Sequence, residues 1–159
     1  FDKIVKSLEL DDLLSNLLGN KSELLKSLVL YFIDSQKHVG QLFSKWLYKN
    51  YAYLTKKPSE GTISNLYNHD ITDTIIIDFL CSWTRQASNF NFLEKIIISL
   101  DSTSINTSTS NVDLAEYGHS KGNECLPQIN ICYAINQDTG LPLFYDIYPG
   151  SINDQTQLE

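Results

Sequence analysis

The feature that most constrains the fold is the segment Ile96–Leu100, in which four of five residues are large and apolar. A short run of this kind is typical of a strand that is buried on both faces of a sheet. Asp101 follows the run directly, and three hydroxyl residues come after it at positions 102–104. We therefore predict a buried strand that ends by presenting the Asp101 carboxylate rigidly at the rim of a sheet.

The chain before this strand is predicted to be helical. Apolar residues recur at spacings of three and four through residues 1–33, which indicates two amphipathic helices. Gly19-Asn20 is predicted to end the first helix, and Ser22 is a candidate N-cap for the second. Such a pair of helices can serve DNA binding or assembly, or it can be a plain helical hairpin, and the sequence leaves both interpretations open.

The segment 35–59 differs from the rest of the chain in charge. It holds five lysines and no acidic residue, although the whole chain has a formal net charge of −7. Because lysines can contact phosphates and rings can stack on bases, one interpretation is a DNA-contacting segment. The other is a solvated lysine face above a core of aromatic rings. The residues concerned are Lys37, Lys45, Lys49, Lys56 and Lys57, with Phe43, Trp46, Tyr48, Tyr51 and Tyr53 between them.

Two further helices are predicted over residues 60–93, the longer of them capped by Thr72 or Asp73. The three cysteines include no Cys-x-x-Cys pair, so we expect reduced thiols and a cytoplasmic location. No apolar run approaches the ~20 residues that a membrane-spanning helix needs, so no membrane partner is expected.

After residue 92 the pattern becomes that of strands. Ile129–Ile135 and Leu141–Tyr148 are predicted to form a hairpin around the turn at residues 138–140, whereas residues 102–127 are predicted to form a long loop. The sequence therefore predicts an α+β fold. We expect a helical region over residues 1–91 and a strand-rich region over residues 92–159, where a further helix begins near Asp154.

Three roles are open for Asp101. Its side chain could cap the loop that follows the strand. It could instead hold divalent metal in a phosphoryl-transfer site, where two ions about 4 Å apart bind the attacking and leaving oxygens. It could also be the nucleophile of an aspartate-dependent phosphatase. Those phosphatases usually carry a second Asp two residues later, and Thr103 occupies that position here.

Five short blocks after residue 94 favour the metal-binding role. The blocks are Asp101-Ser102-Thr103, Tyr117-Gly118-His119-Ser120-Lys121, Gln128, Leu141-Pro142-Leu143, and Pro149-Gly150 with Asp154. In this order and spacing, residues 94–159 resemble the DDE transposases of bacterial insertion sequences, whose catalytic domain has a ribonuclease H-like fold. The resemblance implies that the three strands begin a ribonuclease H-like mixed sheet and that Asp101 is the first catalytic, metal-binding Asp.

The resemblance also implies cofactors and partners. The cofactor is Mg²⁺ or Mn²⁺, with two ions in the complete enzyme, and the partner is double-stranded DNA at transposon ends and target. A homodimer is compatible with the resemblance. The DNA-binding candidates are Tyr117, Ser120 and Lys121, together with Lys45, Lys49, Lys56 and Lys57.

The family's second Asp and its Glu lie on later elements, so we expect this chain to be an N-terminal fragment that is inactive alone. The alternative is a non-catalytic, DNA-binding remnant of a transposable element. One departure from the family follows Lys121: the family often has an acidic residue, then a basic one and a further Asp, and this chain has Gly122-Asn123-Glu124-Cys125.

Overall fold

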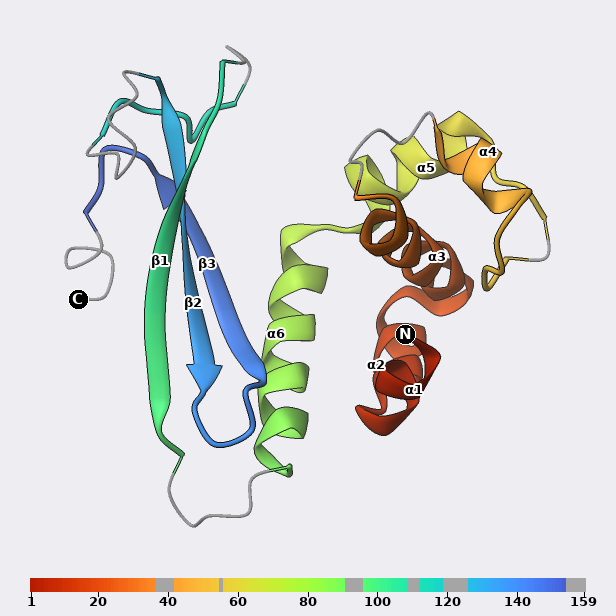
Figure 1. Cartoon of the computed structure of the whole chain (residues 1–159), viewed down its shortest axis with the longest axis horizontal. Coiled ribbons are helices and arrows are strands. Elements are labelled where there is room, and N and C mark those ends of the chain that lie inside the picture. Colours follow the sequence, from red (N-terminus) through yellow and green to blue (C-terminus); the bar gives the residue numbers. More distant parts are fainter. Residues whose placement is uncertain (37–41, 55, 91–95, 109–111, 119–125, 154–159) are drawn as a thin grey trace. The chain divides into compact units, whose positions relative to one another are not determined.

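The computed structural model describes residues 1–36, 42–54, 56–90, 96–108, 112–118 and 126–153. The chain divides into two compact units, a helical unit (Phe1–Trp83) and a sheet unit (Thr84–Glu159) (Figure 1). The predicted α+β class is confirmed. The division falls within the longest helix, whereas the sequence prediction placed it between residues 91 and 92, beyond that helix.

The helices differ greatly in length, from 5 residues in α4 to 16 in α6. They are α1 (Asp2–Ser7), α2 (Leu10–Leu18), α3 (Ser22–Ser35), α4 (Phe43–Leu47), α5 (Glu60–Asn65) and α6 (Asp73–Ser88). A 3₁₀ turn (Gly19–Lys21) joins α2 to α3, and a π-helical segment (Leu66–Asp70) extends α5. Two helices were predicted over residues 1–33. The structure has a further short helix there, α1, which the apolar spacing did not distinguish from α2.

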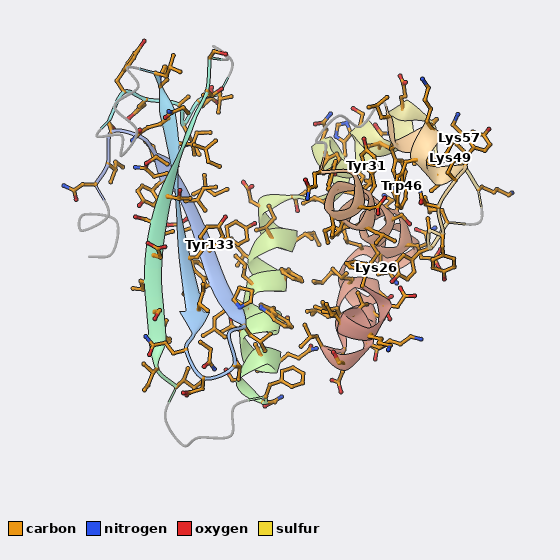
Figure 2. The ribbon with its side chains drawn as sticks, viewed as in Figure 1. Lys26, Tyr31, Trp46, Lys49, Lys57 and Tyr133 are labelled. Carbon is orange, nitrogen blue, oxygen red and sulfur yellow. The ribbon has the colours of Figure 1, made fainter. Side chains whose placement is uncertain are left out.

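Large apolar side chains from α3, α4 and the π-helical segment make the core of the helical unit. The ring centroid of Tyr31 is 5.5 Å from that of Phe43 and 5.6 Å from that of Trp46 (Figure 2). Tyr31 and Phe43 are almost completely buried, as are Leu28 and Leu66. Because rings at these separations attract each other edge to face, aromatic contacts hold α4 against α3.

The helix ends agree with the sequence at two places and differ at one. Helix α2 ends at the predicted Gly19, which adopts a φ of 56° that suits glycine. Thr72 caps α6, because its side-chain oxygen accepts a hydrogen bond from the N–H of Ile75 at 3.4 Å. The predicted cap at Ser22 is wrong. Ser22 is buried as the first residue of α3, and its hydroxyl donates to the Gly19 carbonyl at 2.8 Å, closing the turn instead.

The sheet unit contains three antiparallel strands in the spatial order β1-β2-β3. These are β1 (Ile98–Asn106), β2 (Gln128–Asn136) and β3 (Pro142–Pro149). The predicted hairpin of β2 and β3 is confirmed. Asn136 shapes its turn by accepting the N–H of Asp138 at 2.9 Å, and Gly140 has a φ of 70°. Thr84, near the end of α6, donates its hydroxyl to the Leu143 carbonyl at 2.8 Å, which joins that end to β3.

Strand β1 differs from its prediction in position and in burial. Pairing with β2 continues past Asp101 to Asn106, so residues 102–106 belong to the strand and not to a loop. Ile98 and Leu100 keep 52% and 53% of their surface exposed. An apolar run is buried only where other layers cover both faces of its sheet, and β1 is an edge strand. The backbone pairing, and not apolar character, sets where β1 ends.

Within the described ranges, no helix is both long and apolar enough to cross a membrane. The helix predicted near Asp154 lies outside the residues that the structure describes.

Candidate functional site

Asp101 lies within β1, and not at its end, on one face of the sheet. It is paired with Tyr133 on β2, which is paired in turn with Tyr145 on β3. Directly opposite residues of neighbouring strands point to the same face, so a carboxylate and two phenol rings form a row across the sheet. Figure 2 labels Tyr133 within this row. Asp101 is exposed, so a ligand could reach its carboxylate.

The backbone around Asp101 fixes the direction of one carboxylate oxygen. The N–H of Gln137 bonds to the Ile97 carbonyl, and the N–H of Thr107 bonds to the Pro127 carbonyl, each at 2.9 Å. In an antiparallel ladder every second residue of a strand bonds to its partner. Residues 97 and 107 do so here, and Ser102 lies an odd number of positions from both, so its backbone groups face away from β2. The Asp101 carboxylate accepts the Ser102 N–H at 2.9 Å. One oxygen is therefore held at the outer edge of β1, and the loop-capping role predicted as one option becomes an edge-capping role.

Asp146 on β3 has the same local geometry on the opposite face. Its carboxylate accepts the N–H of the following residue, Ile147, at 2.9 Å. Asp146 is paired with Cys132, whereas Asp101 is paired with Tyr133. Because adjacent residues of a strand point to opposite faces, the two carboxylates lie on different sides of the sheet. Asp146 therefore cannot join Asp101 in one site.

The described residues do not fit a two-ion site by themselves. Among them, no group of three or more His, Cys, Asp or Glu side chains could hold a metal ion. Mg²⁺ and Mn²⁺ prefer several oxygen ligands, and a two-ion site needs carboxylates that contact both ions. Asp101 is a single carboxylate, which is fewer than such a set needs, and no chemical step through metal follows from its geometry alone.

Two glycines from the predicted blocks meet at one end of the sheet. A Cβ atom on Gly118 would lie 1.7 Å from the Gly150 carbonyl oxygen, and one on Gly150 would lie 2.2 Å from the Gln128 carbonyl oxygen. Glu116 and Gln128 exchange two backbone hydrogen bonds, at 2.9 and 3.1 Å. Backbone therefore packs directly on backbone here, and only glycine leaves enough room. We call Glu116, Gly118, Gln128, Asn130 and Gly150 the glycine–amide cluster.

Buried amides hold the glycine–amide cluster together. Gln128 donates from Nε2 to the Gly150 carbonyl at 3.2 Å, and Asn130 donates from Nδ2 to the Ile152 carbonyl at 2.9 Å. Asn130 also accepts the hydroxyl of Ser104 on β1 at 2.9 Å. Sequence reasoning matched Gln128 to a block but missed Asn130. The alternation of polar and apolar residues from Gln128 to Ile131 was the signal for a polar face on this strand.

Of the predicted DNA contacts that follow Asp101 in the sheet unit, the structure describes only a part. Tyr117 lies between Glu116 and Gly118 of the glycine–amide cluster and is 72% exposed. Ser120 and Lys121 lie outside the residues that the structure describes. Tyr117 and Asp101 both belong to the sheet unit, whereas the candidate lysines between 45 and 57 belong to the helical unit.

The basic segment contains both features that its sequence left open. Phe43 and Trp46 pack on the core, and the Trp46 Nε1 donates to an Asp34 carboxylate oxygen at 2.6 Å. Tyr48 and Tyr51 are instead 81% and 71% exposed. All four candidate lysines of the segment, Lys45, Lys49, Lys56 and Lys57, are exposed as well. A lysine face with two open rings therefore lies outside a ring-filled core.

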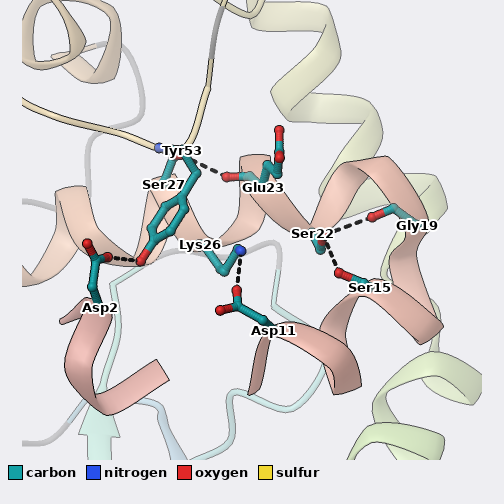
Figure 3. A network of polar contacts seen from close by, with 9 residues as sticks. All are labelled: Asp2, Asp11, Ser15, Gly19, Ser22, Glu23, Lys26, Ser27 and Tyr53. Atoms are coloured by element: carbon teal, nitrogen blue, oxygen red, sulfur yellow. Dashed lines mark hydrogen bonds and ion pairs between the residues drawn. The ribbon is translucent and has the colours of Figure 1, made fainter. Parts of the chain in front are cut away.

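One buried lysine was missed by sequence reasoning. Lys26 of α3 is 7% exposed, forms an ion pair with Asp11 of α2, and lies 4.3 Å from the ring centroid of Tyr53 (Figure 3). The Tyr53 hydroxyl donates to Asp2, and its N–H donates to the Ser27 hydroxyl at 3.1 Å. Burial, followed by the hydrogen bond to Asp2 and the charge of Asp2, raises the pKa of Tyr53. This network joins α1, α2 and α3 to the basic segment.

Comparison with known proteins adds no relative: a scan against models of protein families, a search of curated proteins and a search of solved structures each found no match. What the fold and the candidate sites define is an α+β chain with an exposed carboxylate on an antiparallel sheet and an exposed lysine face on a helical unit. Any finer assignment rests on the residues themselves.

Proposed function

We propose that this chain is the N-terminal part of a DDE transposase and that its three strands begin a ribonuclease H-like catalytic domain. Asp101 is the first metal-binding carboxylate in this proposal. The ions are Mg²⁺ or Mn²⁺, and they also need the second Asp and the Glu that the resemblance assigns to later elements. The substrate is double-stranded DNA at the transposon ends and the target, and a homodimer is compatible with this role.

The observation that carries the proposal is the meeting of three predicted blocks in space. Gly118, Gln128 and Gly150 are far apart in sequence, yet each contacts another within the glycine–amide cluster. The glycines in these blocks thus have one physical explanation. Two chain segments approach β2 so closely that no side chain would fit between them. Asp101 belongs to the same sheet. If the short motifs matched the family by chance, there would be no reason for them to contact one another in the fold.

Chemically, Asp101 is suited to holding a cation. It is exposed, and one of its oxygens is held in place by the Ser102 N–H. The β1 backbone pairs with β2 both before and after Asp101, which limits movement of the carboxylate. The resemblance gives the attacking water to the metal ions, so no general base is assigned to this chain.

The test is DNA cleavage by the complete product of the gene, with supercoiled plasmid carrying the flanks of that gene and Mg²⁺ or Mn²⁺. Asp101→Asn is expected to reduce cleavage by about a thousandfold or more, because one ligand of a phosphoryl-transfer site is lost. Asp146→Asn is the matched control. That carboxylate has the same 2.9 Å bond to the next N–H but lies on the other face. Equal cleavage by wild type and Asp101→Asn would show that Asp101 has no catalytic role.

The second candidate function is a DNA-binding protein without cleavage activity, favoured by the exposed lysine face of the helical unit. The logarithm of the binding constant for duplex DNA should fall linearly with the logarithm of the salt concentration. Replacing Lys45 and Lys49 with Gln should lower that slope by about 0.9 for each phosphate that the variant no longer neutralises. The control replaces Lys3 and Lys6, which are exposed on α1, and changes the net charge equally. Salt-dependent binding without cleavage, together with no downstream Asp and Glu in the gene, would favour this function over the transposase.

A further inference from the structure

The helical unit contains a pocket beside α4, and two of the candidate DNA-binding lysines line it. Its volume is about 200 Å³. The pocket is lined by Ser44, Leu47, Tyr48, Leu54, Lys56 and Lys57. All of these residues belong to the segment that lacks acidic residues, so the positive potential at the pocket is not offset by a carboxylate of its own segment.

The walls of the pocket differ in chemistry. Leu47 and Leu54 pack against the hydrophobic core and give the pocket an apolar side. Tyr48 directly follows α4 and is 81% exposed, and the Lys57 ammonium lies 5.6 Å from the centroid of the Tyr48 ring. Lys56 adds a second exposed cation. An open aromatic ring, an apolar wall and two cations therefore meet in one small pocket.

This combination fits a flat ring attached to an anionic group. A pocket of about 200 Å³ is smaller than the ~300–1,000 Å³ of most small-molecule sites, so it suits one ring system better than a whole drug-sized molecule. Bases stack on aromatic side chains regardless of sequence, and lysines meet the neighbouring phosphates. In duplex DNA the bases stay stacked inside the helix, so only an unpaired base could enter.

We propose that this pocket binds one unpaired base of a DNA single strand, with the base against Tyr48 and the adjoining phosphates at Lys56 and Lys57. The inference rests on the DNA-binding part of the proposed function and is independent of Asp101. In this proposal the lysines of the basic segment make two different kinds of contact. Lys45 and Lys49, which do not line the pocket, contact duplex phosphates, while the pocket takes a base where strands separate.

The test measures binding of a labelled oligo(dT) strand and of a duplex of equal length by fluorescence anisotropy. Tyr48→Ala is expected to weaken binding of the single strand by about tenfold, the size of one lost base–ring stack, and to change duplex binding less than about twofold. Tyr48→Phe keeps the ring and should bind like wild type. Tyr51→Ala, which removes a similarly exposed ring outside the pocket, is the matched control.

The lysines are tested in the same assay. Exchanging Lys56 and Lys57 for Gln should weaken single-strand binding more than exchanging Lys45 and Lys49, although both pairs remove the same charge. If Tyr48→Ala and Tyr51→Ala bind the single strand equally while wild type binds duplex, the pocket inference fails and the proposed DNA binding stands. If wild type binds neither DNA, both fail. Tighter binding to oligo(U) than to oligo(dT) would overturn the assignment to DNA.

Discussion

The helical unit and the sheet unit are stabilised by different kinds of contact. In the helical unit, Leu28, Tyr31, Phe43 and Leu66 are almost completely buried and form one apolar core. In the sheet unit, the amides of the glycine–amide cluster are buried, whereas Ile98 and Leu100 remain half exposed. The first unit therefore depends on apolar side chains that exclude water. Over its described residues the second buries fewer of them, Leu143 and Tyr148 among them, and adds closely approaching backbone groups and buried amides.

This difference determines which changes each unit tolerates. An apolar core loses stability in proportion to the methyl groups removed and the cavity that remains. A cluster of close backbone contacts has no room for any added atom, so one extra methyl group forces segments apart. The largest effects are therefore expected where a side chain is introduced into the sheet unit, and the next largest where one is removed from the helical unit.

The substitution Gly118→Ala should have the largest effect. A Cβ atom there would lie 1.7 Å from the Gly150 carbonyl oxygen, so Glu116–Gly118 must separate from Gly150. We expect a loss of about 4 kcal/mol in the free energy of unfolding, among the larger values for point mutants. Hydrogen exchange should show the loss in β2 and β3 but not in α3.

The matched control is Gly61→Ala in α5, where the nearest atom to an added Cβ is 3.7 Å away. Alanine is the better helix former, so this change should stabilise the helical unit by up to about 1 kcal/mol. If Gly118→Ala lowers amide protection in α3 as much as in β2, the two units unfold together and their comparison no longer holds.

The same substitution made in both units should give unequal results. Leu28 is fully buried, so Leu28→Ala leaves a cavity and should cost about 3 kcal/mol. Leu100 on β1 is 53% exposed, so Leu100→Ala should cost less than about 1 kcal/mol. Urea denaturation measures both. Equal costs would mean that Leu100 is buried in solution, as the apolar run in the sequence first indicated.

The sequence predicted well what short-range physics decides. The spacing of apolar residues located α3, Gly19 located the end of α2, and the turn at residues 138–140 located the β2–β3 hairpin. Each of these depends on residues within a few positions of one another. Ser22 shows the limit of such rules, because its hydroxyl could cap a helix or donate to Gly19, and burial at the turn between α2 and α3 favours the donation.

Long-range pairing decided the features that the sequence missed. No local pattern indicates that Gly118 and Gly150 approach each other, or that β1 continues past Asp101 because residues on β2 pair with it. The candidate site was also predicted only in its local part. Its carboxylate was named from the sequence, but its position within an edge strand and its bond to the Ser102 N–H were not.

A smaller effect is expected from the amide of Asn130. Asn130→Leu keeps a similar volume but removes the donor to the Ile152 carbonyl and the acceptor of the Ser104 hydroxyl. The partly buried partners then lose their hydrogen bonds, at a cost of about 2 kcal/mol. Ser104→Ala removes only one of these bonds and should cost less than about 1 kcal/mol. If Asn130→Leu is neutral, apolar packing can replace the amide, and the two units are stabilised more alike than their contacts indicate.

The smallest effect should be a dependence on pH in the helical unit. The pKa of Tyr53 is raised by burial, by the hydrogen bond to Asp2 and by its charge, so the folded state holds the phenol proton more tightly. Below the unfolded value of about 10, this contribution is fully present, and it is lost as pH rises through the higher folded value. The free energy of unfolding of wild type should therefore fall above about pH 10.

Tyr53→Phe removes the titrating group and should make that fall shallower, while the other tyrosines titrate equally in both proteins. Urea denaturation from about pH 8 to about pH 11 compares the two slopes. An identical slope would mean that neither the burial of Tyr53 nor its bond to Asp2 persists in solution. A difference that hydrogen exchange locates in α1 to α3 and not in β2 would sharpen the comparison, because Tyr53, Lys26 and Asp11 then act as a polar network that stabilises the helical unit alone.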